Sequence, residues 1–154
     1  MDQNLLGSII MRYEEAQFTV TRQVNAIIRS IVPEEITVDQ YAMIRYIHKH
    51  GRVTSSELAE IFCVAKSSIT AIVTRLFDKE LIRREPDEKD RRVTYLALTP
   101  RGSEIAVYII TQIQERLSGF IGLFEEEDAR VFIESYEKLA KLLSVQEERG
   151  GKQA

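Results

Sequence analysis

Apolar residues recur at three- and four-residue steps through most of the chain, which is the pattern of amphipathic helices. The first such stripe lies within residues 4–32 and ends before Pro33, which cannot continue a helix. Its members are Leu6, Ile9, Tyr13, Ala16, Val20, Val24, Ile27 and Ile31. A second helix is predicted from Thr37, which can cap it together with Gln40, to Gly51.

Two long helices are predicted within residues 100–146. Thr99 followed by Pro100 is a strong helix start, because proline suits the first helical position. Four acidic residues at 125–128 are expected at the start of the last helix, where negative charge interacts favourably with the helix dipole. The two apolar stripes are Ile105, Ile109, Ile113, Leu117, Phe120 and Phe124, and then Phe132, Tyr136, Leu139 and Leu143.

These long helices predict self-association. A helix of about 22 residues is roughly 33 Å long and extends beyond a small domain. Its apolar stripe then needs a further surface, which a second copy of the chain supplies most simply. We therefore assign residues 4–32 and 100–146 to a homodimer interface, with a single monomeric bundle as the alternative.

Between these helices lie two short helical patterns joined by a tight connection. Thr54 and Glu57 have the spacing of a capping box at the start of the first. Cys63 and Val64 form the turn, and we expect Cys63 to be a small buried hydrophobe rather than a redox sensor. The inward positions are expected to be Leu58, Ala59 and Phe62 in the first helix, and Ile69, Ile72, Val73, Leu76 and Phe77 in the second.

The opposite side of the second helix carries small hydroxyl and basic residues. Such side chains allow close approach to phosphates and base edges in a DNA major groove. Taken alone, they equally fit a solvated polar face, but a hairpin follows and favours DNA binding. The candidate contacts on this helix are Lys66, Ser67, Ser68, Thr70, Thr74 and Arg75, with Ala71 among them.

The hairpin is predicted over residues 83–98. Leu81 and Ile82 are expected to close the preceding helix, and Arg83, Arg84 and Glu85 to begin a strand. Residues 86–90 are polar and rich in turn formers, and residues 93–98 alternate as a return strand.

A carboxylate and a guanidinium stand two positions apart in this hairpin. Asp90 and Arg92 would share one face of an extended segment, so the carboxylate can orient the guanidinium for a narrow minor groove. The alternative is an exposed ion pair of little energetic weight. Arg84, Asp90 and Arg92 are the candidate DNA contacts of the hairpin.

From Glu57 to Gly102 the chain resembles the MarR family of winged helix-turn-helix regulators. The matching segments are ELA at 57–59, SSITAIVTRL at 67–76, LIRR at 81–84, DRR at 90–92 and LTPRG at 98–102. The resemblance implies a homodimeric repressor of a pseudo-palindromic operator, often released from DNA by small ligands or oxidants. It places Ser67, Ser68, Thr70 and Arg75 at recognition-helix positions, and Asp90 and Arg92 in the D-x-R motif of the wing.

The chain departs from the family pattern at both ends of the recognition helix. Ala65 stands where a hydroxyl cap is usual, which forgoes about 1 kcal/mol of helix stability. Glu80 stands where Gly is usual, so a left-handed helix end would be strained there.

The expected fold class is mainly α with a small β-hairpin wing, as one domain. Residues 37–101 form the DNA-binding part, the terminal helices flank it, and residues 147–154 are a frayed tail. The net charge of −3 at first argues against nucleic acid, but residues 37–101 hold 12 basic against 9 acidic residues. The DNA-binding part is thus mildly basic and the flanking helices are acidic. This charge distribution favours docking of the protein on DNA in one orientation.

The sequence lacks the residue patterns that are typical of membrane proteins, metal sites and enzymes. No stretch is long and apolar enough for a membrane span, and the N-terminus does not resemble a signal peptide, so a cytoplasmic location is expected. His48 and His50 do not share a helical face, and with one cysteine no metal site is expected. We expect no cofactor and no catalytic residue, because phosphate loops and nucleophile–base pairs are lacking. A winged adaptor that binds only proteins is the alternative.

Three aromatic residues are candidates for an effector pocket. Phe18, Tyr41 and Tyr46 lie between the frame and the winged part in the predicted layout. They could line a site for a small apolar or aromatic ligand. They fit a plain hydrophobic core equally well.

Overall fold

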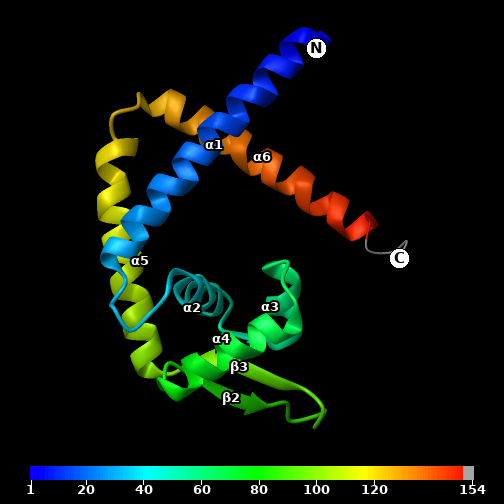
Figure 1. Cartoon of the computed structure of the whole chain (residues 1–154), viewed down its shortest axis with the longest axis vertical. Coiled ribbons are helices and arrows are strands. Elements are labelled where there is room, and N and C mark those ends of the chain that lie inside the picture. The colour runs from blue at the N-terminus through cyan, green and yellow to red at the C-terminus, as the bar shows by residue number, and fades with distance from the viewer. Residues whose placement is uncertain (151–154) are drawn as a thin grey trace. The chain divides into compact units, whose positions relative to one another are not determined.

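The computed structural model describes residues 1–150, with the side chains of residues 1–144. Among these residues the elements are α1 (Gln3–Ile31), α2 (Val38–His50), β1 (Arg52–Thr54), α3 (Ser55–Ile61), α4 (Lys66–Asp78), β2 (Ile82–Pro86), β3 (Thr94–Leu98), α5 (Pro100–Ile121) and α6 (Glu126–Gly150) (Figure 1). The chain forms two compact units that divide after Gln114, within α5. The mainly helical fold with a small wing is confirmed.

The starts of α2 and α3 are fixed by local hydrogen bonds, as the sequence predicts. The Gln40 amide donates to Thr37 Oγ1 at 3.2 Å, and the Gln40 side chain accepts from the Thr37 amide. The Glu57 amide donates to Thr54 Oγ1 at 3.1 Å, and Glu57 Oε2 accepts from the Thr54 amide at 2.6 Å. Each capping box satisfies two backbone donors that the helix itself leaves without a partner.

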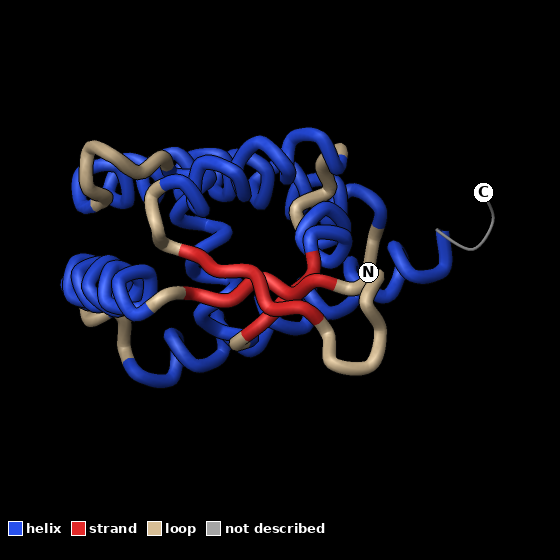
Figure 2. The backbone as a smooth tube through the Cα atoms, turned by 90° about the horizontal axis from the view of Figure 1, so that it is seen from below, coloured by secondary structure: helices blue, strands red, loops and turns tan. Residues whose placement is uncertain are grey.

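The sheet has three antiparallel strands in the order β1-β3-β2, one more than the predicted hairpin (Figure 2). Arg52 of β1 pairs with Ala97, and Ile82 of β2 pairs with Leu98. β1 is three residues long and lies directly between two helices, so it is too short to reveal an alternating pattern. The additional strand, β1, pairs with the outer edge of β3 and so connects the hairpin to the segment between α2 and α3.

One prediction at the end of α4 was wrong. Helix α4 ends at Asp78, so Leu81 and Ile82 do not close it. Glu80 has φ 57°, the left-handed conformation that the sequence comparison anticipates, and the chain turns sharply there. Both apolar residues then belong to the core, 1% and 2% exposed, and Ile82 opens β2.

The core of the winged part lies where α2 packs against α4, β1 and β3, while α4 packs against α3 and β2. Its largest fully buried side chains are Tyr41, Met43, Ile44, Ile47, Leu58, Ile69, Leu76, Leu81, Ile82 and Ile109. Phe77 is an exception to the predicted inward face, since it is 42% exposed. It follows the helical spacing but lies at the last turn of α4, beyond the core.

Cys63 is exposed, so its prediction as a buried hydrophobe was wrong. Its φ of 51° is left-handed and turns the side chain out of the connection between α3 and α4. The thiol donates to the Glu60 carbonyl oxygen at 3.6 Å.

Three segments that are distant in sequence meet at the end of α4, and we call this set of contacts the junction. The Lys79 ammonium donates to the Glu35 carbonyl oxygen, and to Gln40 Oε1 at 2.9 Å. The Arg101 guanidinium lies 3.7 Å from the Glu35 carboxylate. The Thr99 hydroxyl donates to the Glu80 carbonyl oxygen at 2.6 Å and accepts from the Gly102 amide, which caps α5. The loop after α1 and the start of α5 thus both contact the end of α4.

The long helices leave much of their apolar surface exposed. In α1 only Ile28 is buried, and most of the N-terminal stripe is open. Exposed stripe residues are Leu6, Ile9, Tyr13 and Val20 in α1, and Phe132, Tyr136 and Leu143 in α6. Helix α6 begins with three of the four predicted acidic residues, Glu126, Glu127 and Asp128, and continues to Gly150. The last part of the predicted frayed tail, residues 151–154, lies outside the described residues.

Within the second unit, the turn between α5 and α6 surrounds an apolar hollow of about 350 Å³. Its lining consists of Ile121, Phe124, Ala129, Arg130, Phe132 and Ile133. Across the described residues, none of the helices combines the length and the apolar character that crossing a bilayer requires.

Candidate nucleic-acid interface

The outer side of α4 is exposed along its whole length. All six predicted contact residues of this helix are exposed: Lys66, Ser67, Ser68, Thr70, Thr74 and Arg75. The Thr70 hydroxyl donates to the Lys66 carbonyl oxygen at 2.9 Å. With its proton committed to the helix, this hydroxyl is left to act as an acceptor.

The N-terminus of α4 differs from those of α2 and α3. Ala65 makes no side-chain cap, and the first turn contains no acidic residue. The helix dipole therefore presents backbone amides and partial positive charge, beside the Lys66 side chain, without an internal anion. Such a terminus suits a phosphate group.

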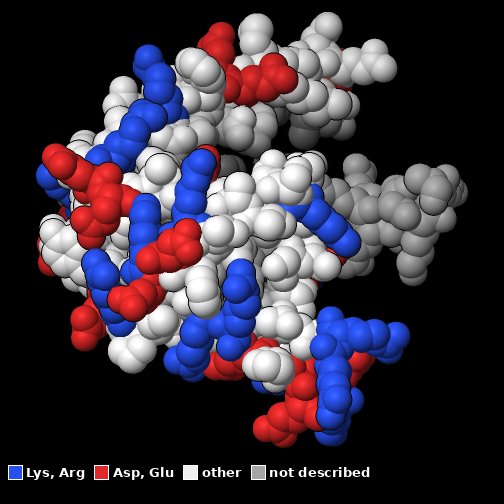
Figure 3. Space-filling model, turned by 60° about the horizontal axis from the view of Figure 1, so that its bottom comes forward, with Lys and Arg blue, Asp and Glu red and all other residues white. Residues whose placement is uncertain are grey.

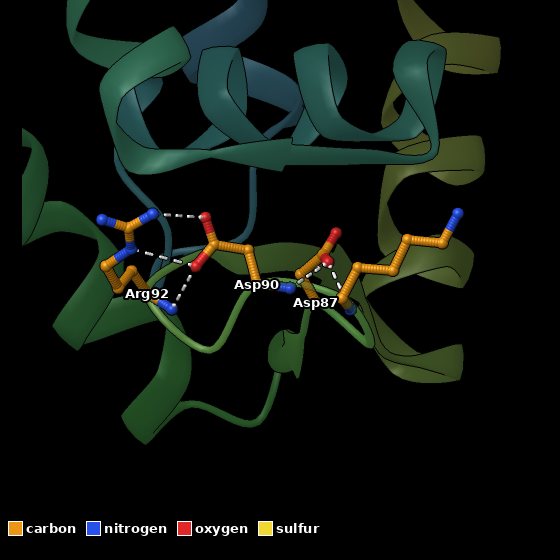
Figure 4. Close-up of polar contacts among 4 residues, drawn as sticks. Asp87, Asp90 and Arg92 are labelled. Atoms are coloured by element: carbon orange, nitrogen blue, oxygen red, sulfur yellow. Dashed lines mark hydrogen bonds and ion pairs between the residues drawn. The ribbon is translucent and has the colours of Figure 1, made fainter.

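Asp90 and Arg92 form the predicted pair, but in a turn rather than on a strand (Figure 4). Asp90 Oδ1 accepts from the Arg92 amide at 3.0 Å and from Nε at 3.2 Å, while Oδ2 accepts from Nη2 at 3.4 Å. The Arg92 side chain is 90% exposed, so the fork is held at its base and open at its outer edge. The hydrogen bonds from the Arg92 side chain, and then from its amide, lower the pKa of Asp90.

Asp87 organises the same turn, which the sequence analysis missed (Figure 4). Its Oδ1 accepts from the backbone amides of Lys89 at 2.8 Å and Asp90 at 2.9 Å. These bonds, that to the Asp90 amide first, lower the pKa of Asp87. The available signal is an aspartate at the start of a turn-rich segment, because its carboxylate can accept from the backbone amides two and three residues later.

The lowered pKa values give the turn a defined pH response. Depressed carboxylate pKa values mean that these contacts stabilise the turn above the ordinary carboxyl range and are lost as the pH falls through the folded-state values. At neutral pH both Asp87 and Asp90 are ionised, and Arg92 is held.

Three arginines of the sheet have different partners. Arg83 is paired with Glu85, 2.8 Å away, and donates to the Leu98 carbonyl oxygen at 3.2 Å. The guanidinium carbon of Arg52 lies 4.2 Å from the centre of the Tyr95 ring. That of Arg84 lies 4.4 Å from the centre of the Phe77 ring. Figure 3 shows basic and acidic side chains interspersed over one face of the molecule, rather than a patch of one sign.

The three aromatic candidates for an effector pocket have different surroundings. Phe18 is 68% exposed, whereas Tyr41 is 2% exposed. Tyr46 packs against His50 and Phe62, with ring centres 4.2 and 6.1 Å apart. The Tyr41 hydroxyl is buried without a hydrogen bond of ordinary geometry among the described residues. Burial raises the pKa of Tyr41, and the nearby Arg45 guanidinium acts in the opposite direction.

Comparison with known proteins assigns this architecture to a family. The model of the MarR family matches residues 36–94, which run from the loop before α2 into β3. The HTH-type transcriptional regulator YsmB of Bacillus subtilis is 33% identical over 104 residues, covering 68% of this chain and 71% of YsmB. The chain belongs to the MarR family. It is thus related to transcriptional regulators.

Solved structures of MarR-family proteins share the fold. A MarR family protein from Bacillus stearothermophilus is similar with a TM-score of 0.80 at 22% identity, covering 94% of this chain and 99% of that protein. FabT of Streptococcus pneumoniae, solved in complex with DNA, gives a TM-score of 0.77 at 23% identity, covering 89% of this chain and 99% of FabT. At these identities the likeness concerns the fold alone.

Proposed function

We propose that this MarR-family protein is a sequence-specific repressor that binds double-stranded DNA as a homodimer in the cytoplasm. The observation that carries the proposal is the wing turn, where Asp90 holds the exposed Arg92 fork by side-chain and backbone hydrogen bonds. A protein-binding adaptor has no need for a guanidinium fixed at its base and open outward. A narrow minor groove attracts such a group through its enhanced negative potential.

The recognition helix would read the major groove through its exposed small side chains. Lys66 and the uncapped amides of the first turn would fix the helix on a phosphate, while Ser68 and Thr70 approach base edges. Because the Thr70 hydroxyl gives its proton to the helix, it would accept from a base amino group, such as that of adenine or cytosine. Arg75 lies further along the exposed side and suits the backbone.

The dimer would use the exposed stripes of α1 and α6. In a two-fold dimer, two recognition helices enter successive major grooves about 34–36 Å apart, which requires a pseudo-palindromic operator. The apolar surface left open on both helices supports this assembly.

A small apolar or aromatic effector is also part of the proposal. The buried Tyr41 hydroxyl, near the Arg45 guanidinium, supplies a polar group, and Tyr46 and Phe18 supply aromatic surface. A ligand with one hydrogen-bonding group would satisfy that hydroxyl.

The decisive experiment is a salt titration of duplex binding with the parent protein, Arg92→Ala and Asp90→Ala, on a site selected from random DNA. The parent should bind saturably, with affinity that falls steeply as salt rises. Arg92→Ala should reduce the salt slope by about one unit if its guanidinium neutralises one phosphate. Asp90→Ala removes a negative charge yet should weaken binding, because Arg92 is no longer oriented.

The sign of the Asp90 effect separates orientation from simple charge. If Asp90→Ala tightens binding and shows no coupling to Arg92 in a double-mutant cycle, the pair is only surface charge. A parent protein without salt-sensitive duplex binding would instead support the adaptor function.

A further inference from the structure

Arg84 of the wing lies over an aromatic ring of the recognition helix. Its guanidinium carbon is 4.4 Å from the centre of the Phe77 ring, within the range of a cation–π contact. Phe77 is in the last turn of α4, and 42% of its surface is exposed. Burial in the core therefore does not account for a large aromatic side chain at this position.

The sheet register explains how Arg84 reaches α4. Arg84 pairs with Leu96 and Ile82 pairs with Leu98, so these residues share the face of the sheet that holds the core. Ile82, Leu96 and Leu98 are buried, whereas Arg84 extends that face to its exposed end. Helix α4 packs against β2, which brings the Phe77 ring beneath the guanidinium.

An aromatic partner leaves an arginine in a different state from a carboxylate partner. Arg83, one residue earlier, is paired with Glu85 at 2.8 Å, so its charge is balanced. Among the described residues, Arg84 forms no ion pair, and a ring face neutralises no charge. The five N–H donors of a guanidinium lie at its edge, so stacking fixes the plane and keeps those donors available.

We propose that Phe77 is a positioning residue for Arg84. Its ring holds the guanidinium in the angle between the recognition helix and the wing, with charge and donors directed to a DNA phosphate or base edge. The stack ties α4 to β2, so the major-groove and minor-groove elements bind as one unit. This inference rests on the proposed DNA-binding function.

The test compares Phe77→Leu, Phe77→Trp and Arg84→Ala by affinity for the selected duplex. Phe77→Leu keeps an apolar side chain but removes the ring face, and should weaken binding about two- to five-fold, the range of an exposed cation–π contact. Phe77→Trp keeps a ring and should bind as the parent does. In an Arg84→Ala background, Phe77→Leu should have no further effect, which is a coupling that lost packing alone would not produce.

The tryptophan variant adds a spectroscopic measurement. The chain contains no Trp, so Phe77→Trp introduces a single indole emitter at the contact. Its emission should change when duplex is added and should differ in the Phe77→Trp/Arg84→Ala double variant. Unfolding temperatures of all variants report whether the fold is retained.

The outcomes distinguish this inference from the proposed function. If the parent binds the duplex but Phe77→Leu binds equally well, the positioning role is wrong and the function stands. An equal loss from Phe77→Leu with and without Arg84 also overturns the role. If the parent does not bind duplex DNA, both the function and the inference fail.

Discussion

The winged part and the long helices have the same kind of sequence pattern but different surroundings. In α2 and α4, the apolar stripe is largely buried against the sheet and neighbouring helices. In α1 and α6 a comparable stripe remains exposed, with Ile9 at 41% and Phe132 at 60%. The spacing that predicts an amphipathic helix does not say whether its apolar face is covered by the same chain. The winged part completes its own core, whereas the apolar stripes of α1 and α6 stay largely exposed.

Substitution of two glycines of α5, one in close contact with the winged part and one in open space, should give the largest contrast in stability. A Cβ at Gly102, at the start of α5, would lie 2.0 Å from the Leu81 carbonyl oxygen, whereas nothing lies within 4 Å of one at Gly119. Gly102→Ala should therefore destabilise the fold by about 3 kcal/mol, because a backbone atom must move. Gly119→Ala should stabilise α5 by roughly 0.5–1 kcal/mol, since Ala favours helix. Urea unfolding monitored by circular dichroism measures both, and equal effects would contradict the close approach.

A charge on the α1 stripe should break the dimer. Ile9→Glu places a carboxylate in the surface that the second copy would cover, and should raise the dimer dissociation constant about a hundredfold by lost burial and added desolvation. Met11→Glu is the matched control, because Met11 is 58% exposed but lies on another side of α1. Sedimentation measures both variants. A stable monomer for the parent at micromolar concentration would contradict the dimer itself.

On α4, a larger side chain should weaken DNA binding even when it adds no charge. Ser68→Leu should reduce affinity for the selected site about tenfold, within the range of one lost base contact, because the larger side chain obstructs groove entry. Ser56→Leu is the control, since Ser56 is an exposed serine of α3. Fluorescence anisotropy with labelled duplex reports both affinities. If the two variants bind equally tightly, α4 does not enter the groove as proposed.

The helix caps should give the smallest effects. Thr54→Ala removes the Oγ1 acceptor of the Glu57 amide, one of the two bonds of the α3 capping box, and should cost about 1 kcal/mol of stability. Ala65→Ser adds a hydroxyl where α4 has no cap and should contribute a similar amount in the opposite direction. Thermal unfolding checks both signs. A destabilised Ala65→Ser variant would mean that the start of α4 cannot accommodate a cap.

Local features were predictable from the sequence, and distant contacts were not. The boxes at Thr37 and Thr54 were confirmed because they join residues three positions apart. Glu80, which stands where the family usually has Gly, does adopt the left-handed conformation that is strained for other residues. The strand at 52–54 was missed because it pairs with Ala97 and its neighbours, far along the chain. The outward position of Phe77 was missed because helical spacing gives a stripe but not where the core ends.

The candidate site was predicted in composition but not in all its geometry. All six α4 residues are exposed as expected, and Asp90 does hold Arg92. The pair lies in a turn, however, because Asp87 binds the amides of Lys89 and Asp90 and bends the chain before β3 begins. Their role in DNA binding stays a prediction. The stack of Arg84 on Phe77 depends on α4 packing against β2, which residue spacing does not encode.

The junction at the end of α4 also has a kinetic consequence. Its Lys79 contacts with Glu35 and Gln40 span 44 and 39 positions, and the Thr99 contact with Glu80 spans 19. The entropy lost in closing a loop grows with its length, so the hairpin of β2 and β3 closes at lower cost than the Lys79 contacts. During folding, the wing and recognition helix therefore have the easier route to native contacts. The loop after α1 is attached by contacts with a greater closure cost than that of the hairpin.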